Sequence, residues 1–234
     1  MNKGNFFAGL AVMVGLIVVG CMMPKAVSTL RSFDRTVNVK GLCEKEVMAD
    51  KVIWHLTYKV VGNDLGAVYS EIERNNDAII KFVQKGGIQG KDITVNVPSV
   101  SDKYAQEYGS NDRTYRYVAT STVTVCSQEI DKVLALMAEQ SSLSKSGIAL
   151  YTTEWESRPE FSFEGLNDIK PEMIEEATRN AREVAQKFAK DSDSKLGKIK
   201  EANQGTFSIS DRDSNTPHIK KVRVVTNVTY YLKN

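Results

Sequence analysis

The residues in this chain that could do chemistry are few and scattered. They include three cysteines and two histidines: Cys21, Cys43, Cys126, His55 and His218. No cysteine or carboxylate stands at metal-ligand spacing beside either histidine, so the sequence predicts no metal site. It also lacks a dinucleotide fingerprint, a phosphate loop and a Gly-x-Ser-x-Gly elbow. We therefore expect no catalytic residues, no cofactor and no enzymatic activity.

The two cysteines of the body differ in their surroundings. Cys43 falls on the apolar face of a strand-like run, and the nearby Glu44 and Glu46 would raise the pKa of its thiol. We expect it to be buried and unreactive. Cys126 ends a later run and is the candidate for an accessible redox thiol. A bond between Cys43 and Cys126 stays open, because sequence does not give their separation.

Two carboxylate pairs have the spacing that acid-base catalysis could use. They are Glu44 with Glu46 and Glu154 with Glu156, both at i, i+2. On a strand this spacing places both members of a pair on one face, and nothing in the sequence indicates a pocket that would shift their pKa values. We interpret both pairs as parts of solvated strand faces.

Aromatic residues offer a further candidate site. Those that could line a ligand cleft are Trp54, Tyr58, Trp155, Phe161 and Phe163. At strand spacing, aromatic side chains more often belong to a core or an interface. A cleft for a small molecule or peptide therefore stays as the alternative interpretation.

The N-terminal segment is the most hydrophobic part of the chain. Phe6–Met23 comprises 18 residues without a charge, just long enough for a hydrocarbon core of about 30 Å. We assign residues 1–24 to a membrane anchor or signal segment, 25–34 to a linker and 35–234 to the body. The small residues before Cys21 resemble a lipoprotein cleavage box, so a retained span, lipidation of Cys21 and ordinary cleavage all remain open. Each alternative predicts a body in the periplasm or at the cell exterior.

The composition is that of an ordinary globular body. Hydrophobic residues make up 41% and charged residues 26%, and the formal net charge is +2. The basic excess flanks the apolar segment and leaves the body close to neutral. Since nucleic-acid binding requires basic clusters, we expect no nucleic-acid partner.

Apolar periodicity predicts an α+β fold of antiparallel strand hairpins and about three helices, in the order β-β-α-β-β-α-β-α-β-β, after one N-terminal transmembrane helix. The expected strands are 36–47, 51–61, 93–97, 114–125, 150–163, 198–209 and 220–232. The expected helices lie within 62–87, 130–137 and 169–192. The first two strands would form a hairpin, and the body would divide into two lobes near residue 145.

Two of these elements lead to specific expectations. In the last helix, Pro171 suits the first helical position, and the predicted buried stripe is Met173, Ala177, Ala181, Val184 and Phe188. In the first hairpin, the residues expected to point inward are Val39, Cys43, Trp54 and Leu56. Those expected to point outward are Lys40, Glu44, Glu46 and His55. Long hairpins leave open strand edges, which favour a homo-oligomer.

Three motifs occur in the order typical of one family: "VKGLCEKEV" at 39–47, "IKPEMI" at 169–174 and "GTFSISDRD" at 205–213. With them, residues 35–232 resemble the SIMPL-domain family of bacterial cell-envelope proteins. The resemblance implies an extracytoplasmic, mostly periplasmic α+β body without established enzyme activity, and it favours the retained anchor. Some relatives form ring-like or channel-like oligomers, and some are linked to oxidative-stress defence. Cys43 stands where the family would have a small residue, so no reactive role is carried over to it.

Overall fold

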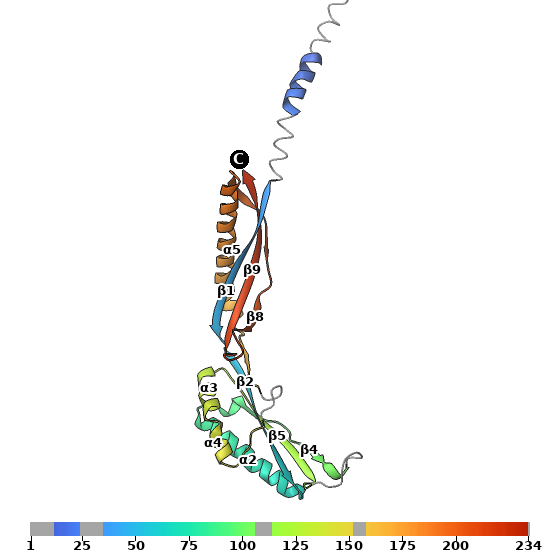
Figure 1. Cartoon of the computed structure of the whole chain (residues 1–234), viewed down its shortest axis with the longest axis vertical. Helices are drawn as coiled ribbons and strands as arrows, with labels where there is room; N and C mark the ends of the chain where they lie inside the picture. The colour runs from blue at the N-terminus through green and yellow to red at the C-terminus, as the bar shows by residue number, and fades with distance from the viewer. Residues whose placement is uncertain (1–11, 24–34, 106–113, 152–157, 234) are drawn as a thin grey trace, which may run out of the picture. The chain divides into compact units, whose positions relative to one another are not determined.

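The computed structural model describes residues 12–23, 35–105, 114–151 and 158–233. It confirms an α+β fold with antiparallel sheets (Figure 1). Its strands are β1 (Thr36–Met48), β2 (Lys51–Gly62), β3 (Ile93–Val95), β4 (Ser99–Asp102), β5 (Tyr117–Ser127), β6 (Glu160–Ser162), β7 (Lys195–Gln204), β8 (Ser208–Asp211) and β9 (Ile219–Lys233). The helices of the body are α2 (Leu65–Lys85), α3 (Ile130–Glu139), α4 (Ser141–Lys145) and α5 (Leu166–Asp191), with a short 3-10 turn at Gly90–Asp92.

The chain divides into two compact units that interleave along the sequence. Unit 1 comprises the residues up to Lys45, Asp168–Ser208 and those from Val222 onward. Unit 2 comprises Glu46–Asn167 and Ile209–Lys221. The long strands β1 and β9 each contribute residues to both units, so each unit is assembled from segments far apart in sequence.

In unit 1, α5 covers one face of a sheet with strand order β1-β9-β7, in which β8 also pairs with β9 (Figure 1). The helix runs antiparallel to β1. Near one end, Lys45 Nζ lies 2.7 Å from Glu172 Oε2, and near the other, Arg35 Nη2 donates to Ser194 Oγ at 2.9 Å. Between them Gly41 faces the helix so closely that an added Cβ would lie 1.8 Å from the Ala177 carbonyl oxygen. The absence of a side chain at Gly41 therefore permits this approach.

The predicted stripe of α5 is partly wrong. The buried positions are Met173, Ala177, Ala181, Ala185 and Ala189, a row at four-residue spacing of the kind that forms a packing ridge. Val184 and Phe188 are 37% and 56% exposed. The prediction followed hydrophobicity, but the helix lies so close to β1 that mainly methyl groups fit between them.

Unit 2 packs α2, α3 and α4 against a sheet of order β3-β5-β2-β6, with β4 also paired to β5 (Figure 1). Asp64 caps α2 by accepting from the Ala67 backbone N–H at 2.7 Å. The apolar core includes Trp54, Leu56, Ile79 and other large side chains. Sequence periodicity predicted most of this packing, because an amphipathic helix and alternating strands supply it locally.

A buried polar cluster lies within this core. Tyr58 Oη is 2.8 Å from Asn76 Oδ1 and 2.9 Å from the carbonyl oxygen of Ile72. Ser121, which is the register partner of Tyr58 on β5, donates to the same Asn76 oxygen at 3.2 Å. These bonds attach the middle of α2 to two adjacent strands.

The expected hairpin between the first two strands is wrong. β1 and β2 belong to different sheets, since the chain between them bonds to other segments instead of reversing. Ala49 N donates to His218 O at 2.8 Å, and Asp50 N donates to Ser162 O at 3.0 Å. The side-chain alternation is nevertheless correct for Val39, Cys43, Trp54 and Leu56, which are all buried.

Smaller differences concern two predicted strands and one strand that was not predicted. β4 lies between the expected strands 93–97 and 114–125, and the expected strand 198–209 is two strands, β7 and β8. The expected strand 150–163 is reduced to a bridge at Leu150 and the short β6, while 152–157 lie outside the described residues.

Of the predicted anchor, residues 12–23 are helical and exposed, and residues 6–11 lie outside the described part. Within the described chain, no helix is both long and apolar enough to cross a membrane.

Candidate functional site

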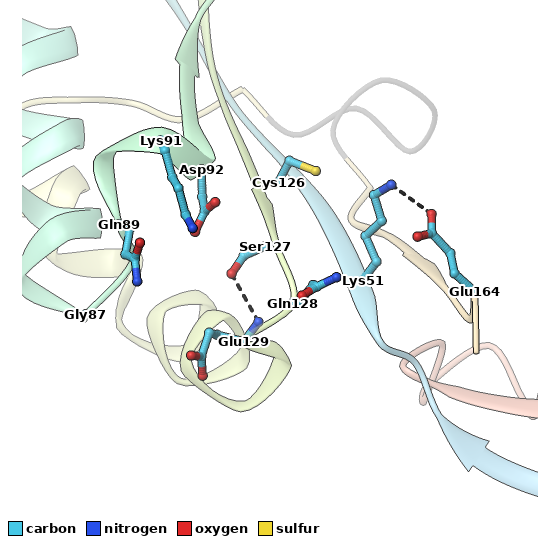
Figure 2. Close-up of a pocket in the computed structure, with 10 residues that line it drawn as sticks. All are labelled: Lys51, Gly87, Gln89, Lys91, Asp92, Cys126, Ser127, Gln128, Glu129 and Glu164. Atoms are coloured by element: carbon cyan, nitrogen blue, oxygen red, sulfur yellow. Dashed lines mark hydrogen bonds and ion pairs between the residues drawn. The ribbon is translucent and has the colours of Figure 1, made fainter. Parts of the chain in front are cut away.

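A pocket with a volume of about 430 Å³ lies in unit 2. Four segments form it: the start of β2, the end of β5 with the chain that leads to α3, the turn that follows α2, and the chain after β6 (Figure 2). The lining residues are Lys51, Gly87, Gln89, Lys91, Asp92, Cys126, Ser127, Gln128, Glu129 and Glu164. With two lysines, three carboxylates and two amides, the pocket suits a small polar molecule better than an apolar one.

An ion pair forms one side of this pocket. Lys51 Nζ lies 2.8 Å from Glu164 Oε1 (Figure 2), and this hydrogen bond raises the pKa of Lys51 above its ordinary value. The Glu164 backbone is held by Asp50, whose carboxylate accepts from Glu164 N at 2.8 Å and from Gly165 N at 2.7 Å. The Lys51 ammonium group is therefore held in an ion pair at this side of the pocket.

The opposite side is formed where β5 leads into α3. Ser127 is buried, and its Oγ accepts from the Glu129 backbone N–H at 3.1 Å (Figure 2). Glu129 Oε2 also pairs with Lys132 at 3.3 Å. These contacts hold the pocket's serine and carboxylate in place.

Cys126 lies at the edge of the pocket. It is exposed and unpaired, and in Figure 2 its side chain points away from Lys91 and Asp92. Cys43 and Cys126 are both free thiols, so the bond left open by the sequence is not formed here. The structure thus places the candidate redox thiol at an accessible position.

Cys43 has the opposite environment, as expected. It is 2% exposed, and its Sγ donates to Glu176 Oε2 at 3.2 Å. Burial, followed by this hydrogen bond to a carboxylate, raises the pKa of the thiol to about 11. The thiolate, which is the nucleophilic form, is therefore scarce at neutral pH.

The carboxylate pair at Glu44 and Glu46 forms ion pairs with two arginines. Glu44 Oε1 lies 3.6 Å from Arg223 Nε, and Glu46 Oε2 lies 3.5 Å from Arg212 Nη1. These are exposed ion pairs on a strand surface, which matches the interpretation from sequence. Glu154 and Glu156 lie outside the described residues.

The aromatic candidates separate into different roles. Trp54 and Tyr58 are buried in the core, and Phe161 packs against it. The Phe161 ring also lies 5.9 Å from that of His218, while His55 Nδ1 is 3.1 Å from Thr124 Oγ1. A smaller pocket of about 150 Å³ borders Trp54 and is lined by β2, the end of α3 and the residues near Leu150 and Pro159. Trp155 lies outside the described residues.

No group of three or more His, Cys, Asp or Glu side chains among the described residues is arranged to hold a metal ion. The polar residues of the large pocket were missed at the sequence level. They come from segments up to about a hundred residues apart, and the only local signal was the Gly86-Gly87 pair, where Gly87 has φ of 89°.

A family model described as "SIMPL: Protein of unknown function" matches residues 37–230. A search of curated proteins finds no match for the chain. The matched region contains all strands and helices of the body except the first and last residues of the outermost strands. The chain therefore belongs to the SIMPL family.

Proposed function

We propose that this SIMPL protein is a non-enzymatic, membrane-anchored protein of the bacterial cell envelope whose body self-assembles. Its role would be that of an envelope scaffold or of protection against oxidative stress. The observation that carries the proposal is the open edge of the unit 1 sheet. β7 pairs only with β9 among the described strands, and nearly all its residues are exposed.

The two halves of β7 differ in their fitness for pairing with another chain. The first half contains Lys195, Lys198 and two register irregularities, features that discourage edge pairing. The second half, Glu201–Gln204, pairs regularly with β9 and carries a single charge. We assign the assembly contact to this second half.

Anchoring is supported by the N-terminal segment. The described helix 12–23 exposes apolar side chains around its circumference, including Val12, Ile17 and Val18. A helix that is apolar on all sides requires an apolar environment. The 18 uncharged residues of Phe6–Met23 could supply a span of bilayer length.

The test is the mass of the full chain in detergent, measured by light scattering over a concentration series. We expect a discrete oligomer that dissociates in an Ala202→Lys/Gln204→Lys variant, because added lysines block edge pairing. Gln186→Lys, on the exposed face of α5, is the matched control and should leave the mass unchanged. A wild-type monomer at every concentration would refute self-assembly.

The stress-protection role would depend on Cys126. Its thiolate would attack a peroxide and break the O–O bond. This gives a cysteine sulfenic acid and, once the leaving oxygen takes up a proton, water or an alcohol, so that one thiol consumes one peroxide. Peroxide consumption by the reduced protein should fall in Cys126→Ser and not in Cys43→Ser. Equal consumption by wild type and Cys126→Ser would remove this role and leave the scaffold proposal intact.

The second candidate function is binding of a small polar molecule, which the pocket beside Lys51 favours. A ligand at 100 times its dissociation constant would stabilise the fold by about 2.7 kcal/mol. Thermal-shift screening of charged envelope metabolites tests this, with Lys91→Ala as the pocket variant and Lys81→Ala as the control. A shift that persists in Lys91→Ala would point to another site.

A further inference from the structure

Charge is distributed unevenly along α5 and the strands beside it. The N-terminal half of the helix, residues 166–176, contains four acidic side chains and one basic side chain. At the other end, the basic residues are Arg35, Arg182, Lys187, Lys190, Lys195, Lys198 and Lys233, and the acidic ones are Glu183, Asp191 and Asp193. All ten of these side chains are exposed. We call this second region the basic end of unit 1.

Contacts between distant segments bring the basic end together. Arg35 Nη2 donates to Ser194 Oγ at 2.9 Å, and the Arg35 carbonyl oxygen accepts from Leu232 N at 2.8 Å. Lys195 and Lys233 are direct register partners on β7 and β9. Like charges directly opposite each other destabilise a sheet, so this arrangement has a cost within the isolated fold.

The same end carries exposed apolar side chains. Phe188 is 56% and Val184 37% exposed, and they lie one turn apart on α5. Lys187 and Lys190 flank Phe188 in sequence and are also exposed. An exposed aromatic and an aliphatic side chain surrounded by lysines are typical of surfaces that rest on anionic membranes.

The chain itself limits how far this end can be from the N-terminal segment. Residues 24–34 join the helix 12–23 to Arg35. Eleven residues extend over at most about 40 Å. If the helix is anchored, this short linker keeps the start of the body close to the bilayer. The body therefore meets the bilayer surface at a high effective concentration.

We propose that the basic end of unit 1, with Phe188 at its centre, docks on the surface of a bilayer that contains anionic lipid. The inference rests on the proposed anchoring and adds a second, electrostatic contact that orients unit 1. Lipid phosphates would offset the opposed Lys195 and Lys233 charges. The contact does not depend on which side of the membrane the body occupies.

The test places the full chain in vesicles of bromine-labelled phosphatidylcholine, with or without about 30% phosphatidylglycerol. A Phe188→Trp variant reports contact with the acyl region through quenching, measured relative to the wild-type chain. Tyr69→Trp, at an exposed position of α2, is the control. We expect quenching at position 188 to be at least about twofold stronger with phosphatidylglycerol, and no quenching at position 69.

Lys187→Glu/Lys190→Glu, added to Phe188→Trp, should remove this difference, as should high salt. Equal quenching with and without anionic lipid would overturn the proposal. So would a blue-shifted emission of Phe188→Trp in lipid-free detergent, because a second copy would then cover Phe188.

An alkaline carbonate wash separates this inference from the anchoring. Protein that stays in the vesicles without quenching at position 188 is anchored but has no docked basic end, which overturns the inference alone. Protein that is quenched at position 188 before the wash and is released by the wash has no anchor, but its basic end contacts the bilayer. This result supports the inference and refutes anchoring.

Discussion

Units 1 and 2 achieve close packing in opposite ways. Unit 2 fills the space between its helices and sheet with large side chains such as Leu56, Ile79 and Val133, all of them buried. Unit 1 brings α5 against the sheet through Gly41 and a row of alanines, and its buried cluster is small. Unit 2 should therefore be sensitive to the loss of side-chain volume, and unit 1 to its addition.

The largest effect is expected for Gly41→Val. Its Cβ would meet two backbone atoms of α5, the Ala177 oxygen at 1.8 Å and the Ala181 nitrogen at 2.6 Å. Since neither can rotate away, the helix must move, and we expect a loss of about 4 kcal/mol or more. Denaturant unfolding measures the loss, and hydrogen exchange should show it mainly in α5.

Gly90→Ala is the control for this change, because the nearest atom to its Cβ is the Gln84 side-chain nitrogen at 3.5 Å. If Gly41→Val retained wild-type stability, the close approach of α5 to β1 would be contradicted.

The complementary change in unit 2 is Leu56→Ala. Leu56 is 1% exposed, so removing most of its side chain leaves a cavity. We expect the free energy of unfolding to fall by about 3 kcal/mol. Val61→Ala on the same strand, where Val61 is 44% exposed, should change the free energy of unfolding by less than about 0.5 kcal/mol. Similar losses for both variants would contradict the described core.

The thiol of Cys43 gives unit 1 a pH dependence. Its pKa is raised from 9.0 to about 11 in the folded chain, so the folded state favours the protonated thiol. The resulting stabilisation is complete below pH 9 and is lost as the pH rises towards 11. Relative to Cys43→Ala, we expect wild type to lose about 2 kcal/mol over this range.

Parallel unfolding curves for wild type and Cys43→Ala from pH 8 to 11 would show that the raised pKa is incorrect. Thiol labelling gives an independent check. At neutral pH the reagent should modify the exposed Cys126 in the native protein and reach Cys43 only on unfolding.

A smaller effect is expected in the polar cluster of unit 2. Tyr58→Phe removes the hydroxyl that lies 2.8 Å from Asn76 Oδ1, but Ser121 still donates to that oxygen. We expect a loss of about 1 kcal/mol. Tyr69→Phe on α2, with Tyr69 43% exposed, should be neutral, and equal effects of the two substitutions would refute the role of the cluster.

The sequence predictions were more accurate for unit 2 than for unit 1. The strand alternation of unit 2 was predictable, because hydrophobic periodicity reports directly on burial by large side chains. In α5 the same rule favoured Val184 and Phe188 and missed Ala185 and Ala189. Alanine is only weakly hydrophobic, so a hydrophobic pattern does not single it out. Alanines suit these positions because α5 lies so close to Gly41, which is more than a hundred residues away in the sequence.

Sequence also predicted the candidate sites only in part. The buried environment of Cys43 and the accessibility of Cys126 could be predicted from their positions in strands. The pocket beside Lys51 could not, since Lys91, Gln128 and Glu164 come together only when three segments meet. The ion pairs that occupy Glu44 and Glu46 depend likewise on Arg223 and Arg212, late in the chain.

By itself, the sequence determined the α+β class, the faces of the strands, the family and the uncharged N-terminal segment. These follow from periodicity and motifs, which act over a few neighbouring residues. Only the tertiary structure decided that β1 and β2 enter different sheets and that β9, not β2, pairs with β1. A strand can pair with any of several strands that are far away in the sequence. The pairing is made by backbone hydrogen bonds, which leave no pattern in the side chains from which it could be predicted.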